Sequence, residues 1–344
     1  MARPTDPALV ERLTRAVGDR YEIDRAVGRG GMATVFLAHR RDDGRRVAIK
    51  ALLPELAASV GGDRFLREIA LESTLRHPGI MGVLDSGDAD GLPWYVMPFV
   101  EGESLRERLD RERPLPVAEA LRITRRVADA LHHAHQQGIV HRDVKPENVL
   151  LAGDEVIVAD FGVARAITIA GGEKLTRTGM IVGTPGYMSP EQTAGTGPAS
   201  PAADQYGLAC ITFEMLAGRE PFTGPTPLVV MAKHAMEAPP GVRVTRPEVP
   251  EHVEGAIRRA LAKQPEQRFA TVADFADALE GKILVGSASL EMADTAPIPA
   301  RPSAAGPSPA PAPSAAAPAA RKPGCGASAA AFLVLVGGAL ALLR

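Results

Sequence analysis

The sequence predicts an α+β protein with two unequal lobes, a small β-rich lobe followed by a larger, mainly helical one. Short runs of alternating apolar residues, separated by turns, occur between residues 21 and 50 and near 81–85 and 93–97 and are typical of strands. From residue 117 onward, apolar residues recur at the spacing of amphipathic helices. Because clefts between lobes are favoured ligand sites, we expect the functional site where the two lobes meet.

The small lobe is expected to combine strands with one helix, and a further short helix is expected before the domain. Between Tyr21 and Lys50 short strands alternate with turns, and Asp42-Asp43-Gly44 favours a hairpin. A helix is predicted downstream because apolar residues recur at helical spacing until His77-Pro78-Gly79 ends it. In chain order, the expected elements are a helix over residues 8–17, strands between 21 and 50, a helix over 63–76, and two strands near 81–85 and 93–97.

The large lobe is expected to be mainly helical after Val100-Glu101-Gly102. Its first long helix should run over residues 117–137, with Ile123, Val127 and Leu131 among its apolar positions. Within this lobe, Val149-Leu150-Leu151 is an apolar run, and residues 155–159 read as a β-branched strand. Further helices are predicted over residues 204–217, 253–263 and 271–281.

The C-terminal segment has a different composition from the rest of the chain. Residues 283–323 are rich in Ala, Pro and Ser and cannot bury enough apolar surface to order themselves, so they read as an extended linker. Residues 325–343 are free of charge and about long enough to span a bilayer as a helix. Arg321 and Lys322 precede this span, which favours a cytoplasmic position for the folded part. The alternative is a buried core helix.

Composition excludes several classes of protein. The formal net charge of the 344 residues is −2, which leaves no footprint for nucleic acid, and no nucleic-acid partner is expected. Two cysteines, Cys210 and Cys325, cannot build a disulfide scaffold. The first residues lack the apolar core of a signal peptide.

One short loop, His141 to Asn148, carries a carboxylate, an ammonium group and an amide. Asp143 could accept a proton from an attacking hydroxyl, and Lys145 could stabilise charge on a phosphate in transfer. Asn148 could bind a hard cation through its carbonyl oxygen. This set suits phosphoryl transfer, in which a protein mainly positions groups and stabilises charge.

Candidate partners of this loop occur elsewhere in the chain. Asp160-Phe161-Gly162 follows a predicted strand, and an Asp at a strand end can hold Mg²⁺. Upstream, the alternating strand Val47-Ala48-Ile49-Lys50 ends in a cation. The Gly-rich turn from Val27 to Val35 lets backbone N–H groups approach a phosphate closely.

Taken in this order, these motifs and the stretch Gly183 to Glu191 resemble the Hanks-type serine/threonine protein kinases, specifically the bacterial membrane-anchored branch. The resemblance covers roughly residues 20–282 and implies the two-lobed protein-kinase fold. It implies a domain over residues 21–282, preceded by an extension over residues 1–20. It also implies a single-pass protein of the cell membrane with a cytoplasmic kinase domain, protein substrates, ATP with Mg²⁺ or Mn²⁺ as cofactors, and a possible homodimer of kinase domains.

The resemblance assigns a role to individual residues. Asp143, Lys145 and Lys50 would be catalytic, and Asn148 and Asp160 would hold the metal. Glu68 would pair with Lys50, with Glu72, one turn later, as the fallback. The ATP-binding residues would be Val27, Gly28, Arg29, Gly30, Gly31, Met32, Ala33, Thr34, Val35, Ala48, Lys50, Met97, Pro98 and Val100.

Two positions in the expected nucleotide site depart from the family pattern. Ala33 stands where a third Gly is usual, which adds one methyl group to the loop. Pro98 replaces a frequent Glu in the hinge; it lacks an N–H but keeps its carbonyl, while Val100 retains both groups. Adenine binding is therefore expected to be preserved.

The resemblance also implies regulation by phosphorylation. Arg142, next to Asp143, would bind a phosphothreonine of the loop from Gly162 to Pro190, with Thr176 and Thr178 as the expected phosphosites. Thr184 would position the substrate. Structural roles are implied for two further features, an ion pair of Glu191 with Arg268 and a supporting Asp204.

Two other functions remain open at this stage. A non-catalytic scaffold of kinase-like fold would usually lack one of Lys50, Asp143, Asn148 and Asp160, and this chain has all of them. A small-molecule phosphotransferase of related fold would not need the peptide-positioning stretch from Gly183 to Glu191.

Overall fold

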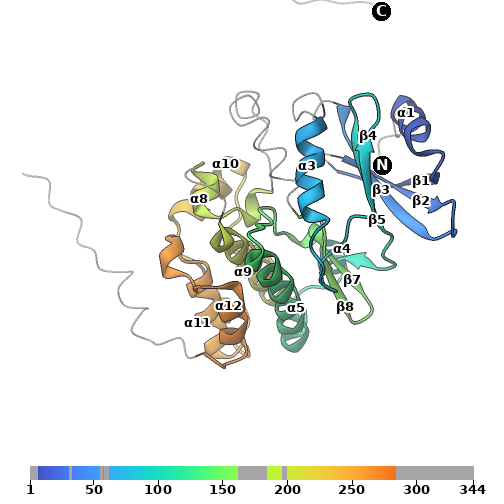
Figure 1. Ribbon diagram of the computed structural model, residues 1–344. Coiled ribbons are helices and arrows are strands. Elements are labelled where there is room, and N and C mark those ends of the chain that lie inside the picture. The colour runs from blue at the N-terminus through green and yellow to red at the C-terminus, as the bar shows by residue number, and fades with distance from the viewer. Residues whose placement is uncertain are drawn as a thin grey trace, which may run out of the picture. The chain divides into compact units, whose positions relative to one another are not determined.

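The computed structural model describes residues 7–30, 33–54, 57, 62–161, 184–195 and 200–283. They all lie in one compact unit, residues 1–292. Within it, strands dominate the N-terminal part and helices the C-terminal part (Figure 1). The predicted α+β fold with two unequal lobes is confirmed.

The small lobe is built on an antiparallel sheet in the order β1-β2-β3-β5-β4. The predicted hairpin turn joins β2 to β3, where Gly44 has φ +69° and the side chain of Asp43 accepts the N–H of Arg45 at 3.1 Å. The strands are β1 (Tyr21–Arg29), β2 (Ala33–Arg40), β3 (Arg46–Leu52), β4 (Asp85–Asp88) and β5 (Pro93–Pro98).

Among the described residues of the small lobe, α1 (Pro7–Val17) and α3 (Gly62–Glu72) pack against the sheet. Both predicted helices are present, although α3 ends four residues earlier than expected. The two helices contribute to one core, which also contains the buried side chains of the sheet. The buried side chains that they supply are Leu9, Leu13 and Val17 from α1 and Phe65 and Ile69 from α3.

The strand predicted near residues 81–85 is wrong, because β4 lies at Asp85–Asp88. Ile80 instead forms a bridge to Val158, and Met81 N–H donates to the oxygen of Val158 at 2.8 Å. The apolar run thus joins the small lobe to a strand of the large lobe. Strand β4 shows no alternation of apolar residues, because it lies at the edge of the sheet. Its Gly87 packs closely on Trp94, and a Cβ on Gly87 would lie 2.5 Å from that ring.

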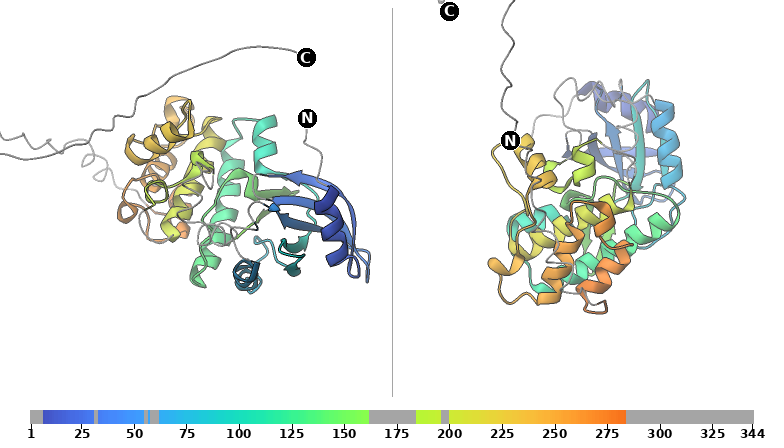
Figure 2. Two further views of the ribbon diagram at one scale, coloured as in Figure 1. Left: turned by 90° about the horizontal axis from the view of Figure 1, so that it is seen from above. Right: turned by 90° about the vertical axis from the view of Figure 1, so that its left-hand side faces the viewer.

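The large lobe contains a small antiparallel sheet, β6-β7-β8, and a group of helices (Figures 1 and 2). The sheet consists of β6 (Glu103–Ser104), β7 (Val149–Ala152) and β8 (Glu155–Val158). The helices are α4 (Leu105–Arg111), α5 (Val117–Gln136), α8 (Pro190–Thr193), α9 (Pro201–Ala217), α10 (Pro227–Met236), α11 (Glu251–Ala260) and α12 (Val272–Leu279). The described part of the lobe also has short 3-10 turns, η1 (Pro146–Asn148), η2 (Pro185–Tyr187), η3 (Val242–Val244) and η4 (Pro265–Gln267).

Helix α9 is the centre of the large lobe. It is buried continuously from Ala203 to Leu216 and packs against α5, α11 and α12. A buried hydrogen bond of 3.0 Å between Thr124 and Thr212 joins α5 to α9. At Gly207 an added Cβ would lie 2.9 Å from the backbone oxygen of Val144, so α9 can approach the loop that carries Asp143.

Candidate active site

Asp143 lies on the loop between α5 and β7, where two residues of the same loop hold it. Lys145 Nζ donates to Asp143 Oδ2 at 2.5 Å. Asn148, at the end of η1, donates through Nδ2 to the backbone oxygen of Asp143 at 2.8 Å and lies 3.4 Å from Oδ2. The three residues that the sequence pointed to on this loop are therefore in direct contact.

The loop is anchored by Asp204, in the first turn of α9. Its Oδ1 accepts the backbone N–H of Arg142 at 2.7 Å, and its Oδ2 accepts that of His141 at 2.8 Å. His135 of α5 contacts Oδ2 through Nε2 at 2.7 Å. Arg142 has φ +75°, which is uncommon for a residue other than glycine, and these bonds stabilise it. The predicted supporting contact of Asp204 with the loop is present.

His141 connects this loop to the segment that contains Asp160. The buried imidazole is bonded through Nε2 to the oxygen of Ala159 at 2.9 Å, and its ring centroid lies 4.6 Å from that of Phe161. Val158 is the last residue of β8. The side chains of Asp143 and Asp160 are thus held on neighbouring backbone segments.

Asp160 receives two hydrogen bonds from the small lobe, one on each carboxylate oxygen. Lys50 Nζ lies 2.6 Å from Oδ2, and the hydroxyl of Tyr95 donates to Oδ1 at 2.6 Å. Burial alone would raise the pKa of Asp160, but the charge of Lys50 and the bonds from Lys50 and Tyr95 lower it below its ordinary value. Asp160 is therefore an ionised group at neutral pH.

The sheet register explains why several predicted ATP-site residues share one surface. Lys50 lies opposite Val35 on β2 and opposite Tyr95 on β5, while Ala48 lies opposite Met97. Side chains two residues apart on a strand lie on the same face. Ala48, Lys50 and Met97, far apart in the sequence, are thus brought together on the face from which Lys50 reaches Asp160.

The Gly-rich turn and the hinge flank this surface. Among the described residues, no atom lies within 4 Å of where a Cβ on Gly28 would be, and a Cβ on Gly30 would lie 3.9 Å from the oxygen of Ala33. The N–H of Gly30 donates to the oxygen of Ala33 at 2.9 Å, which closes the turn. Pro98 ends β5, and the N–H of the next residue, Phe99, donates to Arg46 at 3.4 Å.

Helix α3 carries both candidate acids for Lys50. Glu72 is buried, and burial, then the charges of Asp160 and Glu68, raise its pKa well above the ordinary value. Among the described residues, no hydrogen-bond partner reaches Glu72 Oε1. Lys50 forms an ion pair with Asp160, with Nζ 2.6 Å from Oδ2. The pairing of Lys50 with Glu68 stays a prediction.

Thr184 precedes a segment that is tied firmly to the large lobe. Its oxygen accepts the N–H of Tyr187 at 3.1 Å, at the end of η2. The hydroxyl of Tyr187 donates to Glu214 Oε2 at 2.5 Å, and Arg106 of α4 bridges both groups at 3.2 and 2.9 Å. This buried set holds the backbone next to Thr184 in place.

Helix α8 links the same segment to the loop of Asp143. Ser189 caps the helix through a reciprocal pair of bonds with Gln192. The side-chain amide of Gln192 then donates to the backbone oxygen of Arg142 at 2.8 Å. Ser189 is therefore the N-cap of this helix.

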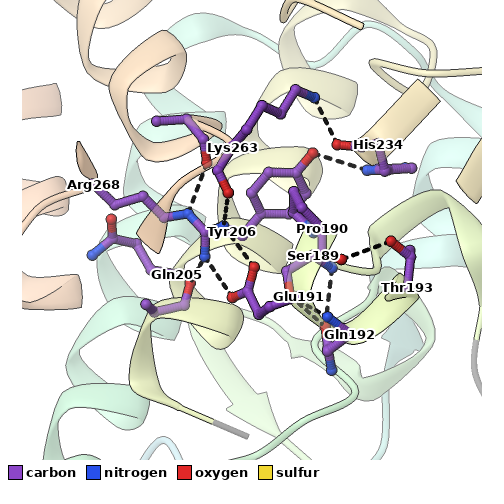
Figure 3. A network of polar contacts seen from close by, with 12 residues as sticks. Ser189, Pro190, Glu191, Gln192, Thr193, Gln205, Tyr206, His234, Lys263 and Arg268 are labelled. Atoms are coloured by element: carbon purple, nitrogen blue, oxygen red, sulfur yellow. Dashed lines mark hydrogen bonds and ion pairs between the residues drawn. The ribbon is translucent and has the colours of Figure 1, made fainter. Parts of the chain in front are cut away.

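Glu191 and Arg268 form the expected contact as a bidentate ion pair, in which both N···O distances are 2.8 Å (Figure 3). Arg268 is 2% exposed and also donates to backbone oxygens of Ala202 and Ala262. Burial would raise the pKa of Glu191, but the bond and charge of Arg268 lower it. This pair joins α8 to Arg268, the residue that directly follows η4.

The model of the protein kinase domain family matches residues 21–279, about three quarters of the chain. The chain belongs to the protein kinase family. Among its curated relatives are a probable serine/threonine-protein kinase of Streptomyces coelicolor, 39% identical, and the serine/threonine-protein kinases PrkC of Bacillus subtilis, 39% identical, and PknB of Mycobacterium tuberculosis, 37% identical. The matches cover 74–76% of this chain but 38%, 40% and 42% of these relatives, so the kinase spans about two fifths of their length.

A solved structure supports the fold of this kinase. The crystal structure of a fragment of Rad53 in complex with AMP-PNP matches with a TM-score of 0.63 and 24% identity. The match covers 76% of this chain and 65% of that chain. At this identity the likeness concerns the fold alone.

Members of the kinase family use ATP and a divalent metal, and the donor set here fits such an ion. Asp160 offers carboxylate oxygens, each of which has accepted one hydrogen bond and keeps a second lone pair. Asn148 uses its amide nitrogen toward Asp143, which leaves the carbonyl oxygen as its donor atom to a cation. Hard oxygen donors from one or two side chains, completed by phosphate and water, are the usual surroundings of Mg²⁺.

Some predicted features of the kinase lie outside the described residues. These are Gly31 and Met32, the phosphosites Thr176 and Thr178, and the C-terminal residues 284–344. Within the described ranges, no helix combines the length and apolar character that crossing a bilayer requires.

Tyr95 was not among the site residues expected from the sequence. It is 4% exposed, and its hydroxyl lies at the centre of the site, on Asp160. The signal that could have found it is the alternation of β5, which places Tyr95 on the same face as Met97. The group of Arg106, Tyr187 and Glu214 was also missed, because it joins three distant segments.

Proposed function

We propose that this chain is a serine/threonine protein kinase that transfers the γ-phosphoryl group of ATP to hydroxyls of protein Ser and Thr residues, with Mg²⁺ or Mn²⁺. The observation that carries the proposal is the pair of bonds from Lys50 and Tyr95 to Asp160, next to the linked side chains of Asp143, Lys145 and Asn148. The names of the relatives favour Ser and Thr as acceptors.

In this mechanism each of the loop residues has a separate task. Asp143 orients the attacking hydroxyl and accepts its proton. Lys145, 2.5 Å from Asp143, supplies positive charge where the transferred phosphoryl group gains negative charge. Asn148 and Asp160 hold the divalent ion, which neutralises phosphate charge when bound.

The nucleotide is assigned to the face of the sheet around Lys50. Lys50 binds the α- and β-phosphates, and its alternative partners are the acids of α3, Glu68 first and Glu72 as the fallback. Ala48 and Met97 contact the adenine, and the backbone of Pro98 and Val100 supplies its hydrogen bonds. The Gly-rich turn, Val27 to Val35, covers the phosphates, which the open space around Gly28 favours.

Regulation and location form a second part of the proposal. Arg142 binds phosphorylated Thr176 or Thr178, and Thr184 orients the substrate, while kinase domains phosphorylate one another as a transient homodimer. The domain over residues 21–282 stays in the cytoplasm, joined by the linker over residues 283–323 to a membrane helix over residues 325–343.

The test is autophosphorylation of the full chain with labelled ATP and Mg²⁺. Asp143→Asn and Lys50→Met are each expected to reduce incorporation at least about 100-fold, because each removes a group that acts in the transition state. Melting temperatures close to that of the wild type would show that both variants fold. Mapping of the label should find it on Thr176 or Thr178.

Two results would reject the proposal. Equal incorporation of label by the wild type and Asp143→Asn would show that Asp143 is not the proton acceptor. No incorporation by the wild type, together with no thermal stabilisation by MgATP, would favour a non-catalytic scaffold.

A further inference from the structure

Tyr95 and Lys50 act on one carboxylate from the same face of the small-lobe sheet. They are direct cross-strand partners on β5 and β3, so their side chains leave the sheet side by side. Lys50 donates to Oδ2 of Asp160 and Tyr95 donates to Oδ1, each at 2.6 Å. One donor on each oxygen fixes both the position and the rotation of the carboxylate.

The hydroxyl of Tyr95 needs its hydrogen bond to Asp160, because the residue is buried. Tyr95 is 4% exposed, and burying a hydroxyl without a hydrogen bond is costly. The phenol of tyrosine is protonated at neutral pH, so the hydroxyl donates its hydrogen to the carboxylate. Hydrogen bonds to a charged group are stronger than neutral ones.

Asp160 needs such support from outside its own segment. Its backbone has φ +64°, in the left-handed region that residues other than glycine rarely adopt. Asp160 lies two residues after Val158, the last residue of β8, so its backbone is not hydrogen-bonded as part of the sheet. The side-chain bonds from the small lobe therefore contribute to the orientation of Asp160.

We propose that Tyr95 is a positioning residue for phosphoryl transfer, whose hydroxyl holds the carboxylate of Asp160 in the orientation that binds the divalent metal. The two bonds leave one lone pair on each oxygen for the ion. This inference rests on the proposed function, because it requires Asp160 to be a metal ligand.

The ring of Tyr95 has a second role that must be separated from that of the hydroxyl. Its centroid lies 6.2 Å from that of Phe65 on α3, so the ring is part of the core. Tyr95→Phe removes the hydroxyl and keeps the ring. Tyr21→Phe is a matched control, because Tyr21 is also buried in the small lobe and donates to a carboxylate, Asp85, at 3.1 Å, but belongs to the outer strand β1.

The experiment titrates Mg²⁺ into the full chain in the presence of ATP and follows nucleotide affinity by calorimetry and autophosphorylation rate in parallel. Tyr95→Phe is expected to need about tenfold more Mg²⁺ for half-maximal ATP binding, as the loss of a hydrogen bond to a charged group implies. The rate should recover at excess Mg²⁺. ATP affinity measured in a metal chelator should equal that of the wild type.

Several outcomes would overturn the inference. They are an unchanged or lower Mg²⁺ requirement for Tyr95→Phe, or an equal rise in Tyr21→Phe. Tyr95→Leu, which lacks ring and hydroxyl, should show the same Mg²⁺ shift as Tyr95→Phe; a shift in the Leu variant alone would assign the effect to packing. Asp160→Asn tests the underlying function separately, since unchanged Mg²⁺-dependent ATP binding there would reject Asp160 as a ligand.

Discussion

His234 shows how one buried side chain can control the response of the domain to pH. It is fully buried on α10, where its Nδ1 lies 3.0 Å from the hydroxyl of Tyr206 (Figure 3). Its ring packs edge-on against that of Phe222. Lys263 Nζ donates to its backbone oxygen at 2.8 Å and lies 4.3 Å from the Phe222 ring centroid. Burial, then the charge of Lys263, lower the pKa of His234 to about 4.

This pKa predicts a loss of stability in mild acid. Below pH 6.5 the unfolded chain protonates His234 while the folded chain does not, so protonation favours unfolding. The contribution of the neutral His234 to the free energy of unfolding is complete above pH 6.5 and is lost as the pH falls to about 4. The free energy of unfolding should change by roughly 3 kcal/mol over this range. His234→Gln should remove this dependence, which urea unfolding at pH 7.5 and pH 4.5 would measure.

His252→Gln is the matched control, because His252 is exposed on α11. It should lose as much stability between the two pH values as the wild type. If His234→Gln did so too, the buried imidazole would not be the source of the acid sensitivity.

The contacts among Asp143, Lys145 and Asn148 were predictable from the sequence, because the three residues lie within six positions on one loop. Tyr95 was not, since its role depends on the pairing of β3 with β5. A shift of that register by one residue would turn Tyr95 to the other face of the sheet. Sequence spacing carries no information on this register.

At the scale of elements, helix α1 is part of the kinase lobe although the family match begins at residue 21. Leu9, Leu13 and Val17 are buried against the sheet. Arg12 donates to the backbone oxygens of Ala89 at 3.2 Å and Asp90 at 2.6 Å, in the turn between β4 and β5. The helix thus covers apolar surface and fixes a turn.

Leu13→Ala is therefore expected to destabilise the domain by about 2–5 kcal/mol, the usual cost of a cavity at a fully buried leucine. Glu11→Ala, on the exposed side of the same helix, should change stability by less than about 0.5 kcal/mol. Denaturant unfolding measures both. Equal effects would mean that α1 adds nothing to the core.

The predictability of elements followed their periodicity. Helix α5 was expected over residues 117–137 and lies at Val117–Gln136, because its polar and apolar faces are distinct. Helices α4 and α10 were missed. The first has only seven residues, and the second is largely apolar, with Leu228 and Met236 exposed, so neither has a clear period. Tertiary contacts, not pattern, define them.

At the scale of the whole molecule, the proposed membrane helix makes a prediction about location. The full chain should sediment with membranes and resist extraction by high salt and alkaline carbonate. The reason is that burial of about 18–20 apolar residues in the bilayer gives a more favourable binding free energy than electrostatic adsorption to its surface. A chain that ends at Ile283 should stay in the soluble fraction. Release of the full chain by carbonate would contradict the proposed span.

Asp204 and Asp160 divide the site into two halves with separate supports. Asp204 fixes the loop of Asp143 wholly within the large lobe, through His135, His141 and Arg142. Asp160 receives its bonds from strands of the small lobe. If Asp160 binds the metal as proposed, a tilt of the small-lobe sheet by about one hydrogen-bond length would break the two bonds to Asp160 and leave the Asp143 loop in place.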